Sequence, residues 1–511
     1  MKKEYLLFIL VLTVSAYPVS AKSYSILDFG AIPNVLSTKA IQQAIDACYN
    51  DGGGTVVVPA GIFITGTIIL KSKVNLYLEQ GSELVSSKNL EDFIISSQHY
   101  GMIYCQDATQ VSITGEGVIH ALGTDFYETD KNHGVNNSQD APNDYDKMLT
   151  RQKENYMPEG VFFTDGPIKR KPRPGMTIVF FHCNQVSIKD ITIKDTPVWA
   201  VRFSYCEDVL VDGITILNNL LIPNSDGIHL TVSRNVRIAN CDIRAGDDCI
   251  IVTGFAKEED TPGFNSEEQD KYTHGNKTIY AENVQVINCH LQSRSSAIRI
   301  GYGQHPIRRI ICNNIVISES NRGIGIYARD ASGIEDLIFS NIIIETRLHN
   351  GAWWGHGEPI HISAVTRFEG EPVGTIKNVQ FNHINATGEQ GILIYGAEES
   401  RMENIQFNHV QLRINKGRET MSYGGNLDLR PTSFRDKQIF EHDIPGLFAQ
   451  YVDNLTIRDF SLVWGEGLPA FFTHGIECQE VKELLLDGFE GDANPGSPTG
   501  QKCFLRNTTL R

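Results

Sequence analysis

Hydrophobic and polar residues alternate through a phrase of ten residues that recurs along most of the chain. Two examples are "NQVSIKDITI" from Asn184 and "ENVQVINCHL" from Glu282. Alternation with a period of two predicts a strand, and the Asn, Asp or Gly near the middle of each phrase predicts a bend. Each phrase is therefore interpreted as a strand, a bend and a second strand.

The spacing of these phrases predicts the fold. Their first apolar residues are Val186, Val209, Val236, Val284, Ile310, Leu337, Val379, Ile405, Leu455 and Leu484. Most successive members are one turn apart, and the three wider intervals are one turn with an insertion or two turns. Strands that repeat in the same direction at this period cannot form hairpins, so we expect an all-β, single-stranded, right-handed parallel β-helix, a solenoid.

Two other all-β architectures fit the pattern less well. A β-sandwich would show hairpin turns between the alternating runs, and a leucine-rich solenoid would show leucine at regular places. The bend positions favour the β-helix further, because Asn recurs there and tolerates the left-handed backbone of a tight bend. We expect these residues to stack as a hydrogen-bonded ladder of Asn240, Asn288, Asn314 and Asn341.

The N-terminal region predicts an export signal and a cap. Lys2 and Lys3 precede a short apolar run that ends in Val19-Ser20-Ala21, which is typical of a cleaved signal peptide over residues 1–21. An N-terminal membrane anchor is the alternative. Further on, "TKAIQQAIDACYN" from Thr38 has helical spacing and ends before a glycine run, and we expect this helix to cover the open apolar end of the solenoid. Residues 22–511 are then one domain.

Three polar stretches interrupt the repeat, at 124–175, 254–277 and 347–358. Insertions in a solenoid usually gather on one face, often the binding face. The ten cysteines of an exported chain raise the question of disulfides. Three of them lie within strand-like runs and are interpreted as small core residues: Cys241, Cys289 and Cys312. Cys478 and Cys503 could form a bridge.

The formal net charge of −16 argues against nucleic-acid binding through the overall field of the protein. Three acidic residues nevertheless gather at one place in the pattern. Asp226 comes just before the apolar run Gly227–Leu230, and Asp247 and Asp248 come just before Cys249–Val252, one turn later. Because adjacent parallel strands lie about 4.8 Å apart, we expect these carboxylates to cluster. Crowded carboxylates raise one another's pKa and are usually retained for metal binding or acid–base work.

The sequence resembles glycoside hydrolase family 28, the polygalacturonases and related pectin hydrolases. "NSDG" at 224–227 and "GDDC" at 246–249 are similar to two blocks of that family, and "ITGEGVIHALG" at 113–123 is similar to a third stretch. The resemblance implies that Asp247 is the general acid, that Asp226 and Asp248 hold and deprotonate the attacking water, and that hydrolysis proceeds with inversion without metal or cofactor.

Two further family blocks are altered here. Ser296 in "SSAIRIG" stands where the family has the histidine of Gly-His-Gly, and Gly325 and Tyr327 in "GIGIY" stand where it has Arg-Ile-Lys. Those basic residues grip a sugar carboxylate, so ordinary endo-polygalacturonase action is not expected.

Other residues are candidates for contact with the saccharide. Arg299 and His229 alternate outward on their strands, and Arg299 could pair with a uronate carboxylate. Each has a plainer interpretation as a surface residue. The remaining candidates are Asn224, Ser296, Arg322, Tyr327, Trp353 and Trp354. The two tryptophans could pack on sugar rings or anchor their loop.

The sequence therefore predicts an inverting hydrolase of α-linked galacturonic acid in homogalacturonan or rhamnogalacturonan fragments. We expect it to be exo-acting or specific for oligosaccharides, exported to the periplasm or secreted, monomeric, and not membrane-bound after signal cleavage. A neutral-sugar glycosidase and a Ca²⁺-dependent pectate lyase are the enzymatic alternatives. A β-helix that only binds glycans is the non-enzymatic one.

Overall fold

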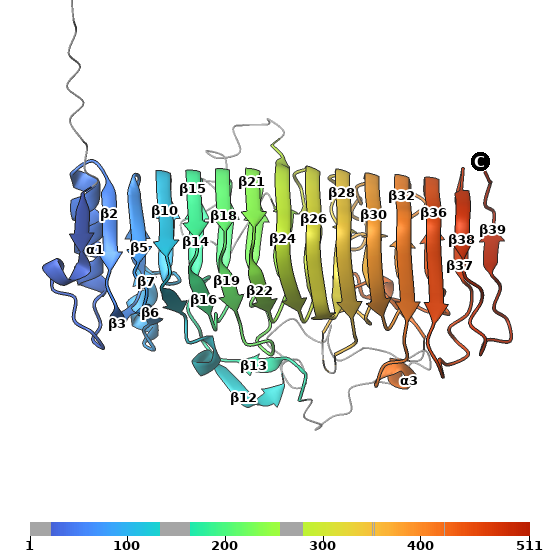
Figure 1. The fold of residues 1–511 in the computed structure, drawn as a ribbon, viewed down its shortest axis with the longest axis horizontal. Helices are drawn as coiled ribbons and strands as arrows, with labels where there is room; N and C mark the ends of the chain where they lie inside the picture. Colours follow the sequence, from blue (N-terminus) through green and yellow to red (C-terminus); the bar gives the residue numbers. More distant parts are fainter. Residues whose placement is uncertain (1–21, 133–163, 256–278, 350, 352, 424) are drawn as a thin grey trace, which may run out of the picture.

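The structure is a computed structural model that describes residues 22–132, 164–255, 279–349, 351, 353–423 and 425–511. The predicted export signal and nearly all of the insertion predicted at 254–277 lie outside these ranges. Within them the chain winds into a parallel β-helix whose coils stack along one axis (Figure 1). The fold predicted from the repeated phrases is confirmed.

The coils build two large parallel sheets. The 13-stranded sheet contains β4 (Ile68–Leu70), β9 (Ile103–Gln106), β14 (Ile178–Phe181), β17 (Val201–Ser204), β20 (Ile228–Thr231), β23 (Ile250–Gly254), β25 (Ser296–Gly303), β27 (Arg322–Ala328), β29 (Ile360–Ala364), β31 (Ile392–Tyr395), β35 (Leu447–Gln450), β37 (Ile476–Gln479) and β39 (Cys503–Arg506).

The 20-stranded sheet contains β1 (Ser23–Ser25), β2 (Gly54–Val58), β3 (Gly61–Thr65), β5 (Val74–Leu78), β6 (Ser82–Ser86), β10 (Thr109–Gly115), β11 (Val118–His120), β15 (Asn184–Lys189), β16 (Thr192–Lys194), β18 (Glu207–Asp212), β19 (Thr215–Leu217), β21 (Arg234–Ala239), β22 (Asp242–Ala245), β24 (Ala281–Ser293), β26 (Ile307–Ser320), β28 (Ile334–Thr346), β30 (Ile376–Gly388), β32 (Met402–Ile414), β36 (Val452–Trp464) and β38 (Leu485–Glu490).

The three wide intervals in the repeat are single coils with insertions. β21 pairs with β24, β28 with β30, and β32 with β36, so each of these intervals adds only one rung to the sheet. The interval between β32 and β36 contains α3 (Thr420–Tyr423), β33 (Leu427–Asp428) and β34 (Ile439–Phe440). Figure 1 shows α3 along the same edge of the molecule as β12 (Tyr127–Asn132) and β13 (Ile168–Arg170), which belong to the insertion predicted at 124–175.

The bends follow the predicted asparagine ladder, with one difference. All four asparagines have a left-handed backbone, with φ between +56° and +58°. Asn288 donates to Asn240 at 3.1 Å and Asn314 donates to Asn288 at 3.4 Å, but Asn341 donates to the neighbouring Asn313 at 2.9 Å. The ladder therefore shifts by one residue at its last step.

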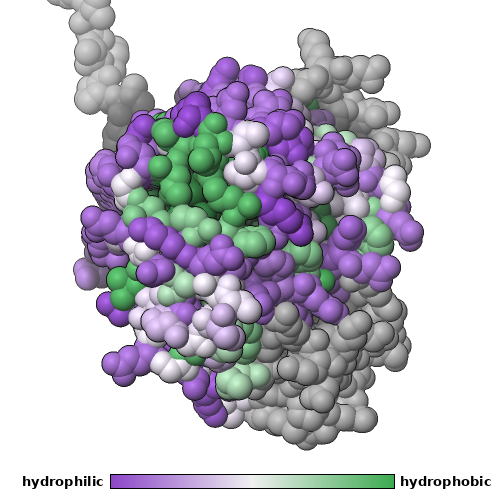
Figure 2. Space-filling model, turned by 90° about the vertical axis from the view of Figure 1, so that its right-hand side faces the viewer, coloured by the Kyte–Doolittle hydropathy of each residue, from purple (hydrophilic) through white to green (hydrophobic). Residues whose placement is uncertain are grey.

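The two ends of the solenoid are covered differently. At the N-terminal end, α1 (Thr38–Asn50) buries Ile41, Ala44, Ile45 and Cys48, which confirms the predicted capping helix. At the C-terminal end, Leu505 and Leu510 are exposed, and Figure 2 shows an apolar area on that face. Every helix in the described part of the chain is too short or too polar to cross a membrane.

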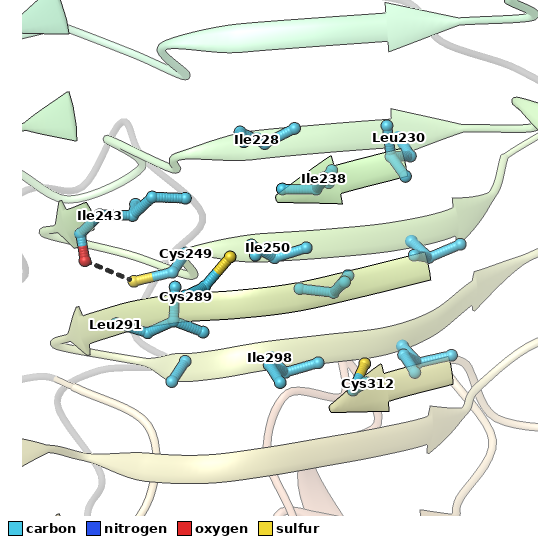
Figure 3. Close-up of a cluster of buried hydrophobic side chains, with 14 of the residues drawn as sticks. Ile228, Leu230, Ile238, Ile243, Cys249, Ile250, Cys289, Leu291, Ile298 and Cys312 are labelled. Carbon is cyan, nitrogen blue, oxygen red and sulfur yellow. Dashed lines mark hydrogen bonds between the residues drawn. The ribbon is translucent and has the colours of Figure 1, made fainter. Parts of the chain in front are cut away.

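Stacked aliphatic side chains and thiols fill the bore. Figure 3 shows Ile228, Ile250 and Ile298 at matching places on three successive strands, β20, β23 and β25, with Cys289 and Cys312 near them. Cys241, Cys289 and Cys312 are buried, as expected. All ten cysteines are free thiols, so Cys478 and Cys503 form no bridge here. Because alternate residues of each strand point inward, their neighbours must point to the outer face, where the candidate site lies.

Candidate active site

Strand register brings the predicted site residues into one column on the outer face of the 13-stranded sheet. Ile228 pairs with Ile250, which aligns Asp226 with Asp248 at the entry to β20 and β23. The column continues through Ser296 and Arg322, which pair directly at the start of β25 and β27. Successive members are separated by one strand spacing, about 4.8 Å.

Asp247 stands beside this column and is half-buried. Its Oδ2 accepts hydrogen bonds from the Asn224 backbone N–H at 3.1 Å and from Asn224 Nδ2 at 3.3 Å. Burial, reinforced by the charge of Asp248, raises the pKa of Asp247 to about 7. A carboxyl with that pKa carries a proton at mildly acidic pH, as a general acid requires. Asn224, predicted to contact substrate, is exposed and positions this carboxyl through both hydrogen bonds.

Asp248 accepts hydrogen bonds from two donors. The Ser296 backbone N–H donates to its Oδ1 and Arg299 Nη1 donates to its Oδ2, both at 2.8 Å. Asp248 is 1% exposed, so the ion pair is well shielded from water. Burial lowers the pKa of Arg299, but the charge and hydrogen bond of Asp248, together with Tyr302 and Asp226, outweigh burial and raise that pKa above its usual value. Arg299 points outward as predicted, and its partner is a catalytic candidate.

Asp226 is buried without a cation of its own. Its Oδ2 lies 3.3 Å from His229 Nδ1, and its Oδ1 has no hydrogen-bond partner among the described residues. Burial and the charges of Asp247 and Asp248 raise the pKa of Asp226 well above its ordinary value. His229 is itself buried, because the ring of Trp199 stacks on it at 3.8 Å between centroids. His229 therefore contacts Asp226 rather than the surface.

The residues that the resemblance placed at the two altered blocks, Ser296, Gly325 and Tyr327, lie against one another. Ser296 Oγ lies 3.1 Å from the Tyr327 hydroxyl, and Arg322 Nη1 donates to that hydroxyl at 3.3 Å. The Tyr327 ring lies across Gly325, so that a Cβ at Gly325 would collide with it. Ser296, Gly325 and Tyr327 therefore depend on one another: Tyr327 reaches Ser296 across Gly325, and any side chain at position 325 would displace the tyrosine ring.

A segment from a distant coil covers this part of the face. We call residues 426–432 the covering segment. Arg322 Nη2 donates to the Asp428 carbonyl at 2.7 Å, Arg329 Nη2 donates to the Leu429 carbonyl at 2.9 Å, and Tyr302 donates to the Pro431 carbonyl at 3.0 Å. Arg322 also pairs with Glu358, at 3.3 Å. Arg322 and Tyr327, both predicted to contact substrate, are completely buried.

The two candidate tryptophans differ in position. Trp353 is buried and its Nε1 donates to the Asp165 carbonyl at 2.7 Å, so it anchors the 347–358 insertion, the plainer of its two interpretations. Trp354 is half-buried, and its carbonyl accepts from Asn321. Sequence reasoning missed Trp199, Tyr302 and the covering segment. The unusually wide interval between Ile405 and Leu455 was the available signal for that segment.

The residues of this column lie within a region that matches the model of a known protein family. The family model "Glycosyl hydrolases family 28" matches residues 159–426, just over half of the chain. The chain belongs to this family. The matched region contains all three aspartates and ends where the covering segment begins.

Curated relatives agree with this assignment, and a solved structure agrees with the fold. The chain is 27% identical over 261 residues to a probable polygalacturonase of Vitis vinifera, which covers 47% of this chain and 46% of the relative. It is also 25% identical over 360 residues to an exo-poly-alpha-D-galacturonosidase of Dickeya chrysanthemi, a match that covers 64% of this chain and 56% of the relative. The match thus spans about half the length of these curated relatives. A family 28 exopolygalacturonase structure from Yersinia enterocolitica covers 92% of this chain and 79% of its own, with a TM-score of 0.62 at 17% identity, which establishes the fold.

Proposed function

We propose that this protein is an inverting glycoside hydrolase that cleaves α-linked galacturonic acid residues in pectin, in homogalacturonan or rhamnogalacturonan fragments. One observation carries the proposal. A carboxyl with a pKa of about 7, Asp247, adjoins Asp248, which forms an ion pair with Arg299 at 2.8 Å. Inverting glycoside hydrolysis uses a carboxylic acid to protonate the departing oxygen and a second carboxyl group to activate water.

The chemistry assigns a different task to each aspartate. Asp247 donates its proton to the glycosidic oxygen as the bond from that oxygen to the anomeric carbon breaks. A water molecule attacks the anomeric carbon from the opposite face and gives its proton to Asp248, whose charge Arg299 stabilises. Asp226, with its raised pKa and its unpartnered Oδ1, orients that water. Both protons are accounted for, and the product has the inverted anomeric configuration.

The covering segment favours action at a chain end. It lies on the outer face, where its carbonyls accept hydrogen bonds from Tyr302 of β25, from Arg322 of β27 and from Arg329 just after β27. A polysaccharide that crossed the column would have to displace this segment and expose buried charges, at a cost of several kcal/mol. We therefore propose release of short products from a terminus.

A neutral-sugar glycosidase is the second candidate, because neutral Gly325 and Tyr327 occupy the places of the family's basic residues. A lyase fits less well, since a lyase needs an Arg or Lys as its base and Arg299 is held in an ion pair with Asp248. We also propose that the protein is exported and acts as a monomer.

The test is digestion of defined homogalacturonan and rhamnogalacturonan oligosaccharides, with product sizes followed by chromatography and anomers by proton NMR. Early mono- or disaccharide of inverted configuration supports the proposal. Random mid-chain products would refute the terminal action, and retained configuration would refute the assignment of roles. An unsaturated, ultraviolet-absorbing product would identify a lyase, and cleavage restricted to uncharged oligosaccharides would favour the neutral-sugar enzyme.

A further inference from the structure

Arg367 lies in a ring of aromatic side chains at the far end of the catalytic strands. Its guanidinium carbon is 5.3 Å from the ring centroid of Phe368, 5.7 Å from that of Tyr302 and 5.9 Å from that of Phe255. Phe255 follows β23 directly, and Tyr302 lies in β25. Phe368 is 45% exposed and the Arg367 side chain is 35% exposed, so the cluster reaches solvent.

This cluster is continuous with the catalytic aspartates. Arg299, which holds Asp248, also packs on the Tyr302 ring, with 4.2 Å between its guanidinium carbon and the ring centroid. The guanidinium groups of Arg299 and Arg367 therefore lie against the same aromatic ring. A chain of contacts thus runs from the reacting groups to a partly exposed cation, through Asp248, Arg299, Tyr302 and Arg367.

Arg367 is also less engaged by protein than the other arginines in this neighbourhood. Arg299 and Arg322 have carboxylate partners at 2.8 and 3.3 Å, and Arg329 donates to carbonyls of the covering segment. Within the described part of the chain, the guanidinium of Arg367 forms an ion pair with Asp330 at 4.0 Å, a longer distance than those of Arg299 and Arg322. The oxygens of Asp330 already accept from the Gly303 N–H at 2.6 Å and from Gln304 at 3.3 Å.

We propose that Arg367, with Tyr302, Phe255 and Phe368, is a subsite that binds the carboxylate of a uronic acid residue in the saccharide. The planar guanidinium pairs with carboxylates through two parallel hydrogen bonds. The surrounding rings hold it in place and offer apolar faces to a sugar ring. This subsite supplies the positive charge that Gly325 and Tyr327 do not. The inference rests on the proposed function, because it assigns the recognition of its anionic substrate.

The experiment measures binding in a catalytically silent background, so that it does not depend on turnover. An Asp247→Asn protein is titrated calorimetrically with tri-galacturonate and with the same oligosaccharide reduced at its carboxyl groups. Adding Arg367→Gln should weaken tri-galacturonate binding about tenfold, the loss expected for a partly exposed charged hydrogen bond. Binding of the reduced oligosaccharide should stay within twofold. Arg367→Lys keeps the charge but loses the bidentate guanidinium, so its affinity for tri-galacturonate should lie between those of the parent and Arg367→Gln.

The control is Arg413→Gln, which removes an exposed arginine from the outer face of β32 and should change neither affinity. Unchanged tri-galacturonate binding in Arg367→Gln overturns this proposal alone. An equal loss for both ligands also overturns it, because the residue would then support the aromatic cluster rather than recognise charge. If the Asp247→Asn protein with Arg367 intact binds the reduced oligosaccharide but not tri-galacturonate, both this proposal and the proposed galacturonide specificity are overturned.

Discussion

Replacement of Arg299 by Gln tests the central ion pair of the site. The variant removes the donor at 2.8 Å from Asp248 and leaves a carboxylate that is 1% exposed, with the Ser296 N–H as its remaining partner. Loss of one member of a buried pair costs about 3–5 kcal/mol of folding free energy. Arg299 retains 11% side-chain exposure, so we expect about 3 kcal/mol.

The same change should move the pH profile in a defined direction. The charge of Arg299 lowers the pKa of Asp247, which burial and Asp248 raise to about 7. Without that charge the pKa rises further, by about one unit, the lower limit of what a neighbouring opposite charge does. Since the general acid must be protonated, the basic limb of kcat/KM shifts to higher pH while its maximum falls.

The assays are urea unfolding and kcat/KM from pH 4 to 10. Arg308→Gln is the matched control, because Arg308 pairs with Glu282 at 2.7 Å but lies on the outer face of β26, away from the site. It should cost less than about 1 kcal/mol and leave the limb unmoved. A basic limb that stays near pH 7 in a folded Arg299→Gln protein, or moves to lower pH, would refute the reasoning.

Three further predictions concern single side chains. Asp247→Asn should lower kcat about a thousandfold. Because the folded state holds this proton up to about pH 7 whereas the ordinary value is 3.8, stability of the parent falls as pH rises between these values, and urea unfolding of the variant should lack that fall. Asp428→Asn should destabilise the protein at pH 7 by about 3 kcal/mol. Arg430 holds the pKa of Asp428 well below its usual range despite burial, so this contribution is lost as pH falls below 3.8, and limited proteolysis should cut the covering segment of the variant first. Trp353→Phe should cost about 1 kcal/mol, the hydrogen bond to the Asp165 carbonyl, and leave KM unchanged in steady-state assays.

Sequence pattern predicted the coils because their cause is local. Period-two alternation and the bend residue are contained in each ten-residue phrase, and stacking follows from burying the apolar face. The aspartate column was predictable for the same reason. Asp226 and Asp248 occupy equivalent places on successive coils, and parallel register brings equivalent places together.

Alternation failed to predict burial on the outer face. It correctly turns His229 away from the bore, yet His229 is buried, and so is the candidate contact residue Arg322, because other segments lie on top of both. Trp199 covers the histidine, and the covering segment meets the arginine across 106 residues of sequence. Contacts of that range do not appear in the periodicity. Trp353 is a further case: it lies in a glycine-rich insertion, yet it is buried because it contacts Asp165, 188 residues away in the sequence.

The covering segment affects the order in which the parts of this solenoid fold. Most contacts of a coil are with its immediate neighbours, so assembly can largely proceed rung by rung as the chain is synthesised. Arg322 and Arg329 are exceptions, because the carbonyls that satisfy their guanidinium groups belong to residues about one hundred positions later. Until those residues arrive, two cations on an otherwise finished surface remain hydrated and the neighbourhood of the aspartates stays open. The catalytic centre therefore closes late, after the coils that bear it are already in place.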